Sequence, residues 1–311
     1  MQSPVPHHGH HWFTVVLWCL LSMWGHADEH AEPESLYFAP GLPRTVAYPN
    51  PLRVIHYTAY TVAWDARRQT PAWTAYHLPQ HPGPVPRAPS RPTRFLVCSI
   101  ADSPVHEAYS NSGYDRGHVV PNHAIAVLHG RTAQRETFLT VNIAPQPPSH
   151  NRGPWMRLER KTFHWSQARG GLWVISGVAH IGEDRLLSGE QPIAIPELWY
   201  TIIMDQGDEG WEAKAIMIPY DAQHDVAVLD HVTTVAALEQ LTGFDFNPAL
   251  SQEEQERIET VTVRWPLAPP PPVAVASEPI SDDVQRIDLN SDTIENCADD
   301  APRDWYAEIS L

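Results

Sequence analysis

The sequence predicts an α+β fold in which a mixed or antiparallel sheet is crossed by one long helix. Short runs rich in β-branched and aromatic residues recur between turn residues, and such runs are typical of strands. One segment, from about 153 to 168, carries both a helix start signal and a stop signal. The 31 prolines and 12 tryptophans are many for 311 residues, so we expect a loop-rich domain.

The N-terminal segment predicts export. Residues 12–24 form an apolar run that is too short to span a membrane comfortably, and the small residue Ala27 follows it. We expect a signal peptide over residues 1–27, a secreted or periplasmic protein, and no stable membrane association after cleavage. Histidines precede the run where lysine or arginine is usual, so an uncleaved anchor is the alternative.

Cleavage near Ala27 would remove Cys19 and leave Cys98 and Cys297. These two cysteines can pair in an oxidising compartment only if their Cα atoms come close enough, which the sequence leaves open.

The expected domain covers residues 51–265 and follows a polar N-terminal segment over residues 28–50. Its first half contains a predicted hairpin, a loop and a strand. Residues 54–63 and 74–78 are rich in β-branched and aromatic residues and flank a turn at 65–71, which predicts a β-hairpin. The proline-rich segment 79–92 predicts a loop, with order resuming at 94–97. Residues 138–143 form an apolar stretch that we interpret as a strand.

In the second half of the domain, the residue pattern predicts three strands, at 172–178, 198–204 and 211–218. The last two are joined by a turn at 206–210. Pro154 suits the first turn of the long helix, and Gly170 and Gly171 suit its end. Shorter helices are expected at 234–241, stopped by Gly243, and at 251–259, where Ser251 and Glu254 have capping-box spacing.

Residues 266–311 are expected to lie outside the folded domain. The proline-rich part, 266–276, predicts a semi-rigid linker, and the acidic remainder predicts a disordered tail.

The net charge of −16 is unevenly distributed. Residues 278–311 hold ten Asp or Glu and two Arg, whereas residues 87–169 hold eleven Lys or Arg and five Asp or Glu. The Debye length at physiological salt is about 8 Å, so a polyanion responds to the local charge more than to the total. The acidic total therefore does not exclude a nucleic-acid substrate.

Three sequence blocks lie in the basic stretch. The first is Asp115-Arg116-Gly117-His118, with a glycine that we interpret as allowing a tight turn; the second runs from Asn142 to Gln146 and the third from Asn151 to Glu159. Together they offer a general base, amide oxygens suited to a hard cation, arginines and a second carboxylate.

In this order and at this spacing, the blocks resemble the DNA/RNA non-specific endonucleases of the ββα-metal superfamily, which include secreted bacterial nucleases and mitochondrial endonuclease G. The resemblance extends more weakly from about Val54 to about Glu259. It implies a ββα-metal nuclease domain over 51–265, with a central, mostly antiparallel sheet and a long helix carrying part of the metal site. It also implies metal-dependent hydrolysis of DNA and RNA phosphodiester bonds with little sequence specificity, leaving 5′-phosphate ends. Whether the chain forms a homodimer stays open.

His118 is the expected general base, because a neutral imidazole can take a proton from water at neutral pH. A buried structural histidine is the alternative. His123, five residues on, lacks such companions and is expected to be structural.

The resemblance assigns Asn151 to a Mg²⁺ site, with Mn²⁺ as an alternative, and Glu159 to water bound by that metal. Taken alone, Asn151 is equally typical of a helix cap, and Glu159 of a solvated surface carboxylate. On one helix the two residues would lie about 80° apart and share a broad face.

The resemblance also places Asn142 near the site and matches Gln146, although a polar residue in an apolar strand can be structural. Arg116 is a candidate phosphate clamp, with Arg94 as a second one, because guanidinium groups match phosphate oxygens.

The chain departs from the family at Phe163, where an arginine is usual four residues after the glutamate. A cation for the transition state is then missing or comes from Arg160 or Lys161. Phe163 and the acidic total motivate a rival function, a non-catalytic module that binds nucleic acid or protein on the same fold. A phosphodiesterase for a small or lipid phosphoester is a third and weaker alternative.

Overall fold

The computed structural model describes residues 38–207 and 210–262. The predicted signal peptide over 1–27, the linker and tail over 266–311 and the cysteine pairing that involves Cys297 lie outside these residues. Within them, no helix is both long enough and apolar enough to cross a membrane.

A seven-stranded sheet forms the centre of the fold, and every neighbouring pair of its strands is antiparallel. Its order is β12-β11-β10-β7-β4-β3-β2. In chain order the strands are β2 (Arg53–His56), β3 (Tyr60–Asp65), β4 (Thr70–Pro79), β7 (Gly171–Ala179), β10 (Leu198–Gly207), β11 (Gly210–Pro219) and β12 (Val232–Thr233). The predicted antiparallel sheet is therefore confirmed.

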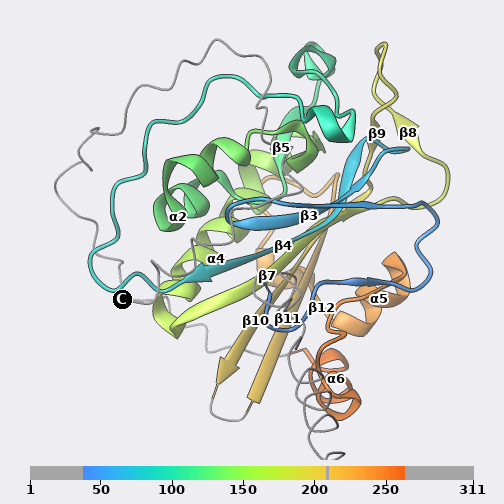
Figure 1. Ribbon diagram of the computed structural model, residues 1–311. Helices are drawn as coiled ribbons and strands as arrows, with labels where there is room; N and C mark the ends of the chain where they lie inside the picture. Colours follow the sequence, from blue (N-terminus) through green and yellow to red (C-terminus); the bar gives the residue numbers. More distant parts are fainter. Residues whose placement is uncertain (1–37, 208–209, 263–311) are drawn as a thin grey trace, which may run out of the picture. The chain divides into compact units, whose positions relative to one another are not determined.

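Helices cover both faces of this sheet (Figure 1). On one face α2 (Asn122–Glu136) and α4 (Met156–Arg169) bury side chains against the sheet, and on the other face α5 (Val235–Thr242) and α6 (Gln252–Glu259) do so. Successive strand residues alternate between these two cores: Tyr76 lies in the first and Ala75 in the second. Because both faces are buried, the central strands are apolar almost throughout.

Short elements complete the fold. Three two-stranded pairs are formed by β1 (Arg44–Thr45) with β13 (Phe244–Asp245), β5 (Asp115–His118) with β6 (Ile143–Gln146), and β8 (Arg185–Leu186) with β9 (Ala194–Ile195). The single turns of helix are η1 (Ser99–Ala101), η2 (His106–Tyr109), η3 (Thr140–Asn142), α3 (Pro148–His150), η4 (Asn151–Trp155) and η5 (Val228–His231).

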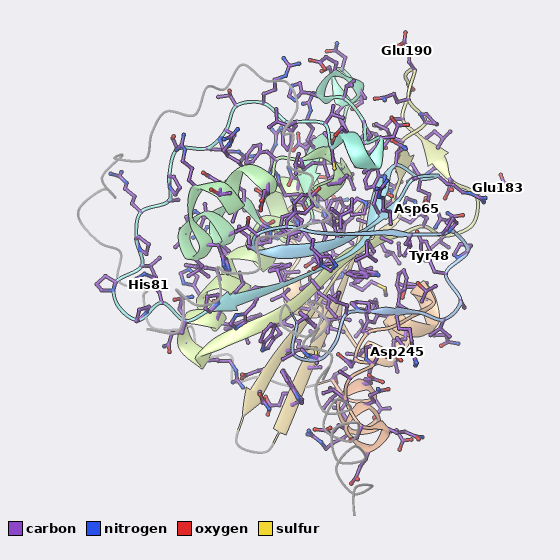
Figure 2. The ribbon with its side chains drawn as sticks, in the orientation of Figure 1. Tyr48, Asp65, His81, Glu183, Glu190 and Asp245 are labelled. Atoms are coloured by element: carbon purple, nitrogen blue, oxygen red, sulfur yellow. The ribbon has the colours of Figure 1, made fainter. Side chains whose placement is uncertain are left out.

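A buried carboxylate fixes the N-terminal segment to the sheet. Asp65 accepts hydrogen bonds from the Tyr48 hydroxyl, at 2.7 Å, and from the Asn50 amide, at 2.8 Å (Figure 2). This contact ties the segment before β2 to the end of β3.

The predicted hairpin and the two short helices are confirmed. The hairpin is β3–β4, although the predicted first strand divides into β2 and β3 at a turn closed by a 2.8 Å hydrogen bond from the Tyr57 amide to the Tyr60 carbonyl. Helix α5 ends at Gly243 with φ 76°, and Ser251 and Glu254 form the expected capping box of α6.

Three local predictions differ from the structure. The long helix begins at Met156 instead of Gly153, because Gly153 has non-helical backbone angles. The predicted strand at 138–143 is wrong: η3 occupies most of it, and only Ile143 belongs to a strand. Helix α2 was not predicted, since Gly130, at φ 81°, interrupts it and no side chain caps its start.

Candidate active site

The Asp115–His118 motif is the strand β5, paired with β6 along its whole length. Gly117 lies in this strand, so the expectation that it allows a tight turn is wrong. A Cβ atom at Gly117 would lie 2.7 Å from Gln146 Cβ and 2.7 Å from Trp199 Cη2. Glycine is needed here because the neighbouring side chains pack directly against the backbone.

The backbone around His118 is fixed from two directions. The Trp155 indole N–H donates to the His118 carbonyl at 3.1 Å. The next amide, of Val119, donates to the Asn142 carbonyl at 3.0 Å, and the amide of Val120 donates to Asn142 Oδ1 at 2.8 Å. The start of α4 and the turn before β6 thus both hold the histidine in place.

Asn142 itself is fully buried and acts on backbone groups. Its Nδ2 donates to the Val120 carbonyl at 3.1 Å and to the Thr137 carbonyl at 3.0 Å. Both amide hydrogens therefore bond to protein groups. This agrees with the alternative that Asn142 is a structural residue. Gln146 is also buried, and its side-chain nitrogen lies 2.7 Å from His150 Nδ1.

The His118 ring lies between two aromatic rings and is 8% exposed. Its centroid is 5.2 Å from that of Phe95 and 4.9 Å from that of Phe138. Within the described residues Nε2 has no hydrogen-bond partner. Burial, and then the positive charge of Arg91, lower the pKa of His118 to about 3, so the imidazole is neutral at pH 7.

Asp115, at the other end of β5, orients Asn151. Asn151 Nδ2 donates to Asp115 Oδ2 at 2.8 Å, and Arg152 donates to both oxygens of the same carboxylate, at 2.9 and 2.7 Å. An ionised carboxylate only accepts, so the nitrogen of the amide must face Asp115, and Oδ1 is left without a hydrogen bond among the described residues. Asn151 makes no side-chain cap bond and has helical angles itself, so it does not act as a side-chain N-cap.

The donor set around Asn151 suits a hard cation with a water-rich shell. No group of three or more His, Cys, Asp or Glu side chains that could hold a metal is found in residues 38–207 and 210–262. A cation there would bind the Asn151 amide oxygen and waters, which is chemistry that Mg²⁺ accepts because it dehydrates reluctantly.

Glu159 lies in the first turn of α4 and is half-buried. Burial raises its pKa to about 8, and the positive charge of Arg91 acts in the opposite direction. It is therefore not a freely solvated carboxylate.

The two predicted phosphate-binding arginines contact protein acceptors. Arg116 donates to the His106 carbonyl through Nε, at 3.1 Å, and Nη2, at 2.7 Å, and Nη2 also lies 3.0 Å from Ser110 Oγ. Arg94 forms a 3.0 Å ion pair with Glu107, and both side chains are exposed.

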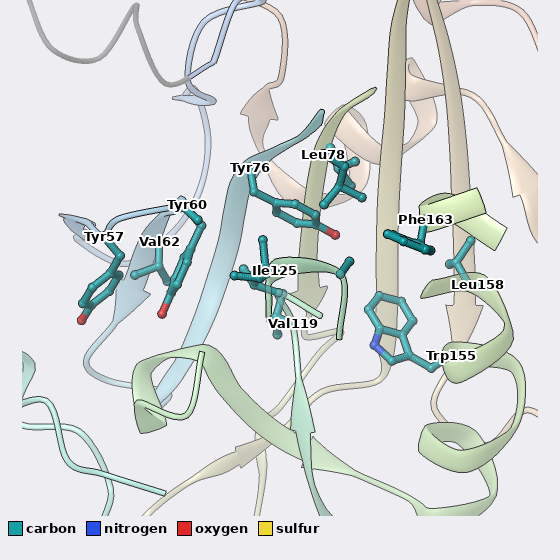
Figure 3. Close-up of a cluster of buried hydrophobic side chains, with 14 of the residues drawn as sticks. Tyr57, Tyr60, Val62, Tyr76, Leu78, Val119, Ile125, Trp155, Leu158 and Phe163 are labelled. Carbon is teal, nitrogen blue, oxygen red and sulfur yellow. The ribbon is translucent and has the colours of Figure 1, made fainter. Parts of the chain in front are cut away.

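Phe163 points into the protein core beside Leu158 and Trp155 (Figure 3). Its ring packs edge-on against His123, at 5.8 Å between centroids. The charge of Arg160 acts on His123 and His164, and that of Lys161 on His164. No hydrogen bond or ion pair joins the side chain of Arg160 or Lys161 to that of His118 or Glu159 in the described part of the chain.

Two residues of this site were not predicted. Arg152 holds Asp115, and the charge of Arg91 acts on both His118 and Glu159. Arg152 is the next residue after Asn151, the predicted metal ligand, so its place in the third motif block could have marked it as a site residue. Arg91 lies in the proline-rich loop outside every motif, and only the excess of basic residues in this region pointed to it.

Two antiparallel strands followed by a helix, with His118 on the first strand and Asn151 just before the helix, are the arrangement of a ββα-metal nuclease. The chain belongs to the DNA/RNA non-specific endonuclease family, whose model matches residues 43–253.

Similar proteins agree with this assignment. Mitochondrial nuclease EXOG of Danio rerio is 29% identical over 234 residues, covering 66% of this chain and 64% of that protein. A nuclease of Nostoc sp. is 29% identical over 218 residues, covering 65% of this chain and 75% of the relative. This chain thus spans less than two thirds of the EXOG relative. A solved EndoG/EndoGI complex has the same fold, with a TM-score of 0.60 and 18% identity, covering 73% of this chain and 94% of that one.

Proposed function

We propose that this protein is an exported, metal-dependent endonuclease that hydrolyses DNA and RNA phosphodiester bonds with little sequence specificity. The observation that carries the proposal is the strand β5. One end holds a neutral, clamped histidine, and the other holds Asp115, which orients the amide of Asn151. A base and a hard-cation ligand are the two parts that water-dependent cleavage of a phosphodiester requires.

His118 takes the proton from the attacking water in this mechanism. A pKa of about 3 keeps the ring neutral but makes it a weak base. An anionic phosphate bound beside the ring favours the protonated form, so the pKa rises toward the working pH when the substrate binds. The hydrogen bonds from Trp155 and Asn142 fix the backbone that carries the ring, and Phe95 and Phe138 pack against the ring itself.

Asn151 is the residue that would hold Mg²⁺ or Mn²⁺, through Oδ1. When bound, the cation supplies a Lewis acid that stabilises negative charge on the phosphate and the leaving oxygen. Asp115, which is held by Arg152, accepts from the Asn151 amide nitrogen, so Oδ1 would be the atom available to a cation. Glu159 is the candidate for orienting water at the site.

Arg116 and Arg94 remain candidates for phosphate binding. Nη1 of Arg116 has no hydrogen-bond partner within residues 38–207 and 210–262, so it can donate to a phosphate oxygen without releasing His106. The exposed pair of Arg94 and Glu107 contributes only about 0 to 1 kcal/mol, so a phosphate can displace Glu107 at little cost.

The test incubates the purified chain with plasmid DNA and with RNA, in Mg²⁺, in Mn²⁺ and in chelator. We expect cleavage of both polymers that requires the metal and is lost in His118→Ala. Full cleavage in chelator, or by His118→Ala, would show that this mechanism is wrong.

A non-catalytic module on the same fold is the second candidate, favoured by Phe163, which stands in the core where a cation is usual in the family. It predicts binding of a polynucleotide without turnover. Measurable cutting by the wild type that disappears in His118→Ala excludes it.

A further inference from the structure

A group of basic side chains surrounds Phe163, the residue that stands where an arginine is usual in the family. The His123 ring on α2 meets the Phe163 ring edge-on, with 5.8 Å between centroids, and the His164 ring on α4 lies at the same centroid distance from Phe163. Arg160 precedes His164 by four residues, so both side chains lie on one side of α4. We call these two histidines, Arg160 and the adjacent Lys161 the basic patch.

The basic patch adjoins the groups proposed to act in catalysis. Phe163 follows Glu159 by four residues, on the same side of α4 and about 6 Å further along the helix axis. His123 is the second residue of α2, which begins four residues after His118. Both helices pack on the same face of the sheet (Figure 1). A nucleic-acid strand continues on both sides of its scissile bond, so a neighbouring phosphate is within reach of side chains as long as arginine and lysine.

No acidic side chain balances the charge of the basic patch. Within residues 38–207 and 210–262, neither Arg160 nor Lys161 forms an ion pair or a side-chain hydrogen bond. Burial is the largest cause of the lowered pKa of His123 and of His164, the other causes are all basic groups, and no carboxylate contributes to either shift. The chain has 37 Asp and Glu and a net charge of −16, so an unbalanced group of basic side chains is unusual in it and fits an anionic ligand.

The side chains of the basic patch are accessible and suit a phosphate. His123, Arg160 and Lys161 are exposed, and His164 is partly exposed. The guanidinium and the ammonium are permanently charged donors, and an imidazole N–H also donates to a phosphate oxygen. Contacts with phosphates fix the position of a nucleic acid without reading its bases. A surface of this kind therefore agrees with cleavage that has little sequence specificity.

We propose that the basic patch binds phosphate groups of the polynucleotide that lie next to the scissile one. The patch extends substrate binding beyond the reacting atoms, from α4 to the start of α2, and favours a polymer as the substrate over a small phosphoester. The inference rests on the proposed nuclease function. No covalent bond forms or breaks at the patch, since its role is electrostatic.

The first test measures duplex DNA binding by the full chain in chelator, over a series of salt concentrations, for the wild type, Arg160→Gln, Arg160→Lys and Arg67→Gln. Arg67 is the matched control, because it is an exposed arginine outside the patch, in the turn between β3 and β4, and its replacement removes the same charge. Each phosphate contact contributes about 0.9 to the slope of log K against log salt. We expect Arg160→Gln to reduce that slope by about 0.9 and to weaken binding about 3- to 10-fold. Arg160→Lys and Arg67→Gln should keep the wild-type slope.

Two further measurements separate phosphate binding from a catalytic or a structural role. With plasmid DNA and Mg²⁺, Arg160→Gln should raise KM and leave kcat unchanged, because the patch contacts the polymer away from the reacting atoms. The free energy of unfolding should not fall in this variant, since the exposed side chain makes no hydrogen bond or ion pair in the described part of the chain. The double variant Arg160→Gln/Lys161→Gln should reduce the salt slope further, to a total of about 1.8.

The outcomes are distinct. If the wild type does not cut nucleic acid, the proposed function and this inference both fail. If the wild type cuts, but Arg160→Gln matches Arg67→Gln in salt slope and KM, only the role of the basic patch is overturned. A fall in kcat or in stability at unchanged salt slope would likewise overturn it, because the side chain would then act in catalysis or in folding.

Discussion

The side-chain nitrogen of Asn151 donates a 2.8 Å hydrogen bond to Asp115, the first residue of the strand that ends at His118. The motif aspartate therefore acts on the candidate metal ligand, since it fixes which atom of the Asn151 amide is left to bind a cation. Arg152 completes the unit by donating to both oxygens of Asp115.

Replacing Asp115 with Asn should weaken metal binding. The substitution removes the charge that holds Arg152 and replaces one of the two carboxylate oxygens with an N–H donor, so Asn151 and Arg152 are left with a single acceptor between them. Loss of such a supporting contact typically costs 10- to 100-fold in metal affinity. Titration of cleavage with Mg²⁺, and of the protein with Mn²⁺, measures the change. Asp184→Asn, which affects a separate ion pair with Arg68, is the control, and an equal affinity in both variants would contradict the role of Asp115.

Replacing Asn142 with Ala should destabilise the protein and lower activity together. The change leaves buried backbone groups of Val120 and Thr137 without partners, and each such group costs about 1 to 3 kcal/mol. The free energy of unfolding measures the first effect, and kcat measures the loosening around His118. Asn122→Ala is the control, because Asn122 makes one long hydrogen bond of 3.5 Å to Thr137. Equal stabilities of the two variants would contradict the clamp.

The protein should lose stability in acid partly through His77. Burial, and then the charge of His129, lower the pKa of His77 to about 4, below its value of 6.5 in the unfolded chain. A histidine with a depressed folded-state pKa contributes stability that is present above 6.5 and is lost as the pH falls toward 4. A shift of this size corresponds to at most about 3 kcal/mol. His77→Phe, which can keep the stacking on Trp173, should reduce the loss in chemical unfolding between pH 7 and pH 4. An unchanged pH profile would argue against the shift.

Glu136 should have the opposite pH dependence. Burial raises its pKa from 4.5 to about 7, so its contribution to stability is fully present below 4.5 and is lost as the pH rises through 7. Glu136→Gln removes the charge and can keep both contacts with Thr58, since an amide both donates and accepts. Relative to the wild type, we expect the variant to gain stability at pH 8 and to show no gain at pH 4, as measured by urea unfolding. A gain of the same size at both values would refute this account.

The sequence by itself determined the parts of the fold that depend on neighbours in the chain. Runs rich in β-branched and aromatic residues predicted the long strands. Gly243 and the Ser251–Glu254 box predicted where helices end or begin, because capping groups lie within one turn of what they cap. The three motif blocks likewise identified the family.

Only the tertiary structure decided how those residues work. The reason for Gly117 is its approach to Gln146 and Trp199, and Asn142 acts on the strand that carries His118. Arg91 belongs to a loop without any motif, and it reaches the site because Phe138, 47 positions away, provides the surface on which it lies. Contacts between residues so far apart depend on the packing of the whole sheet and its helices, and no local pattern in the sequence records them.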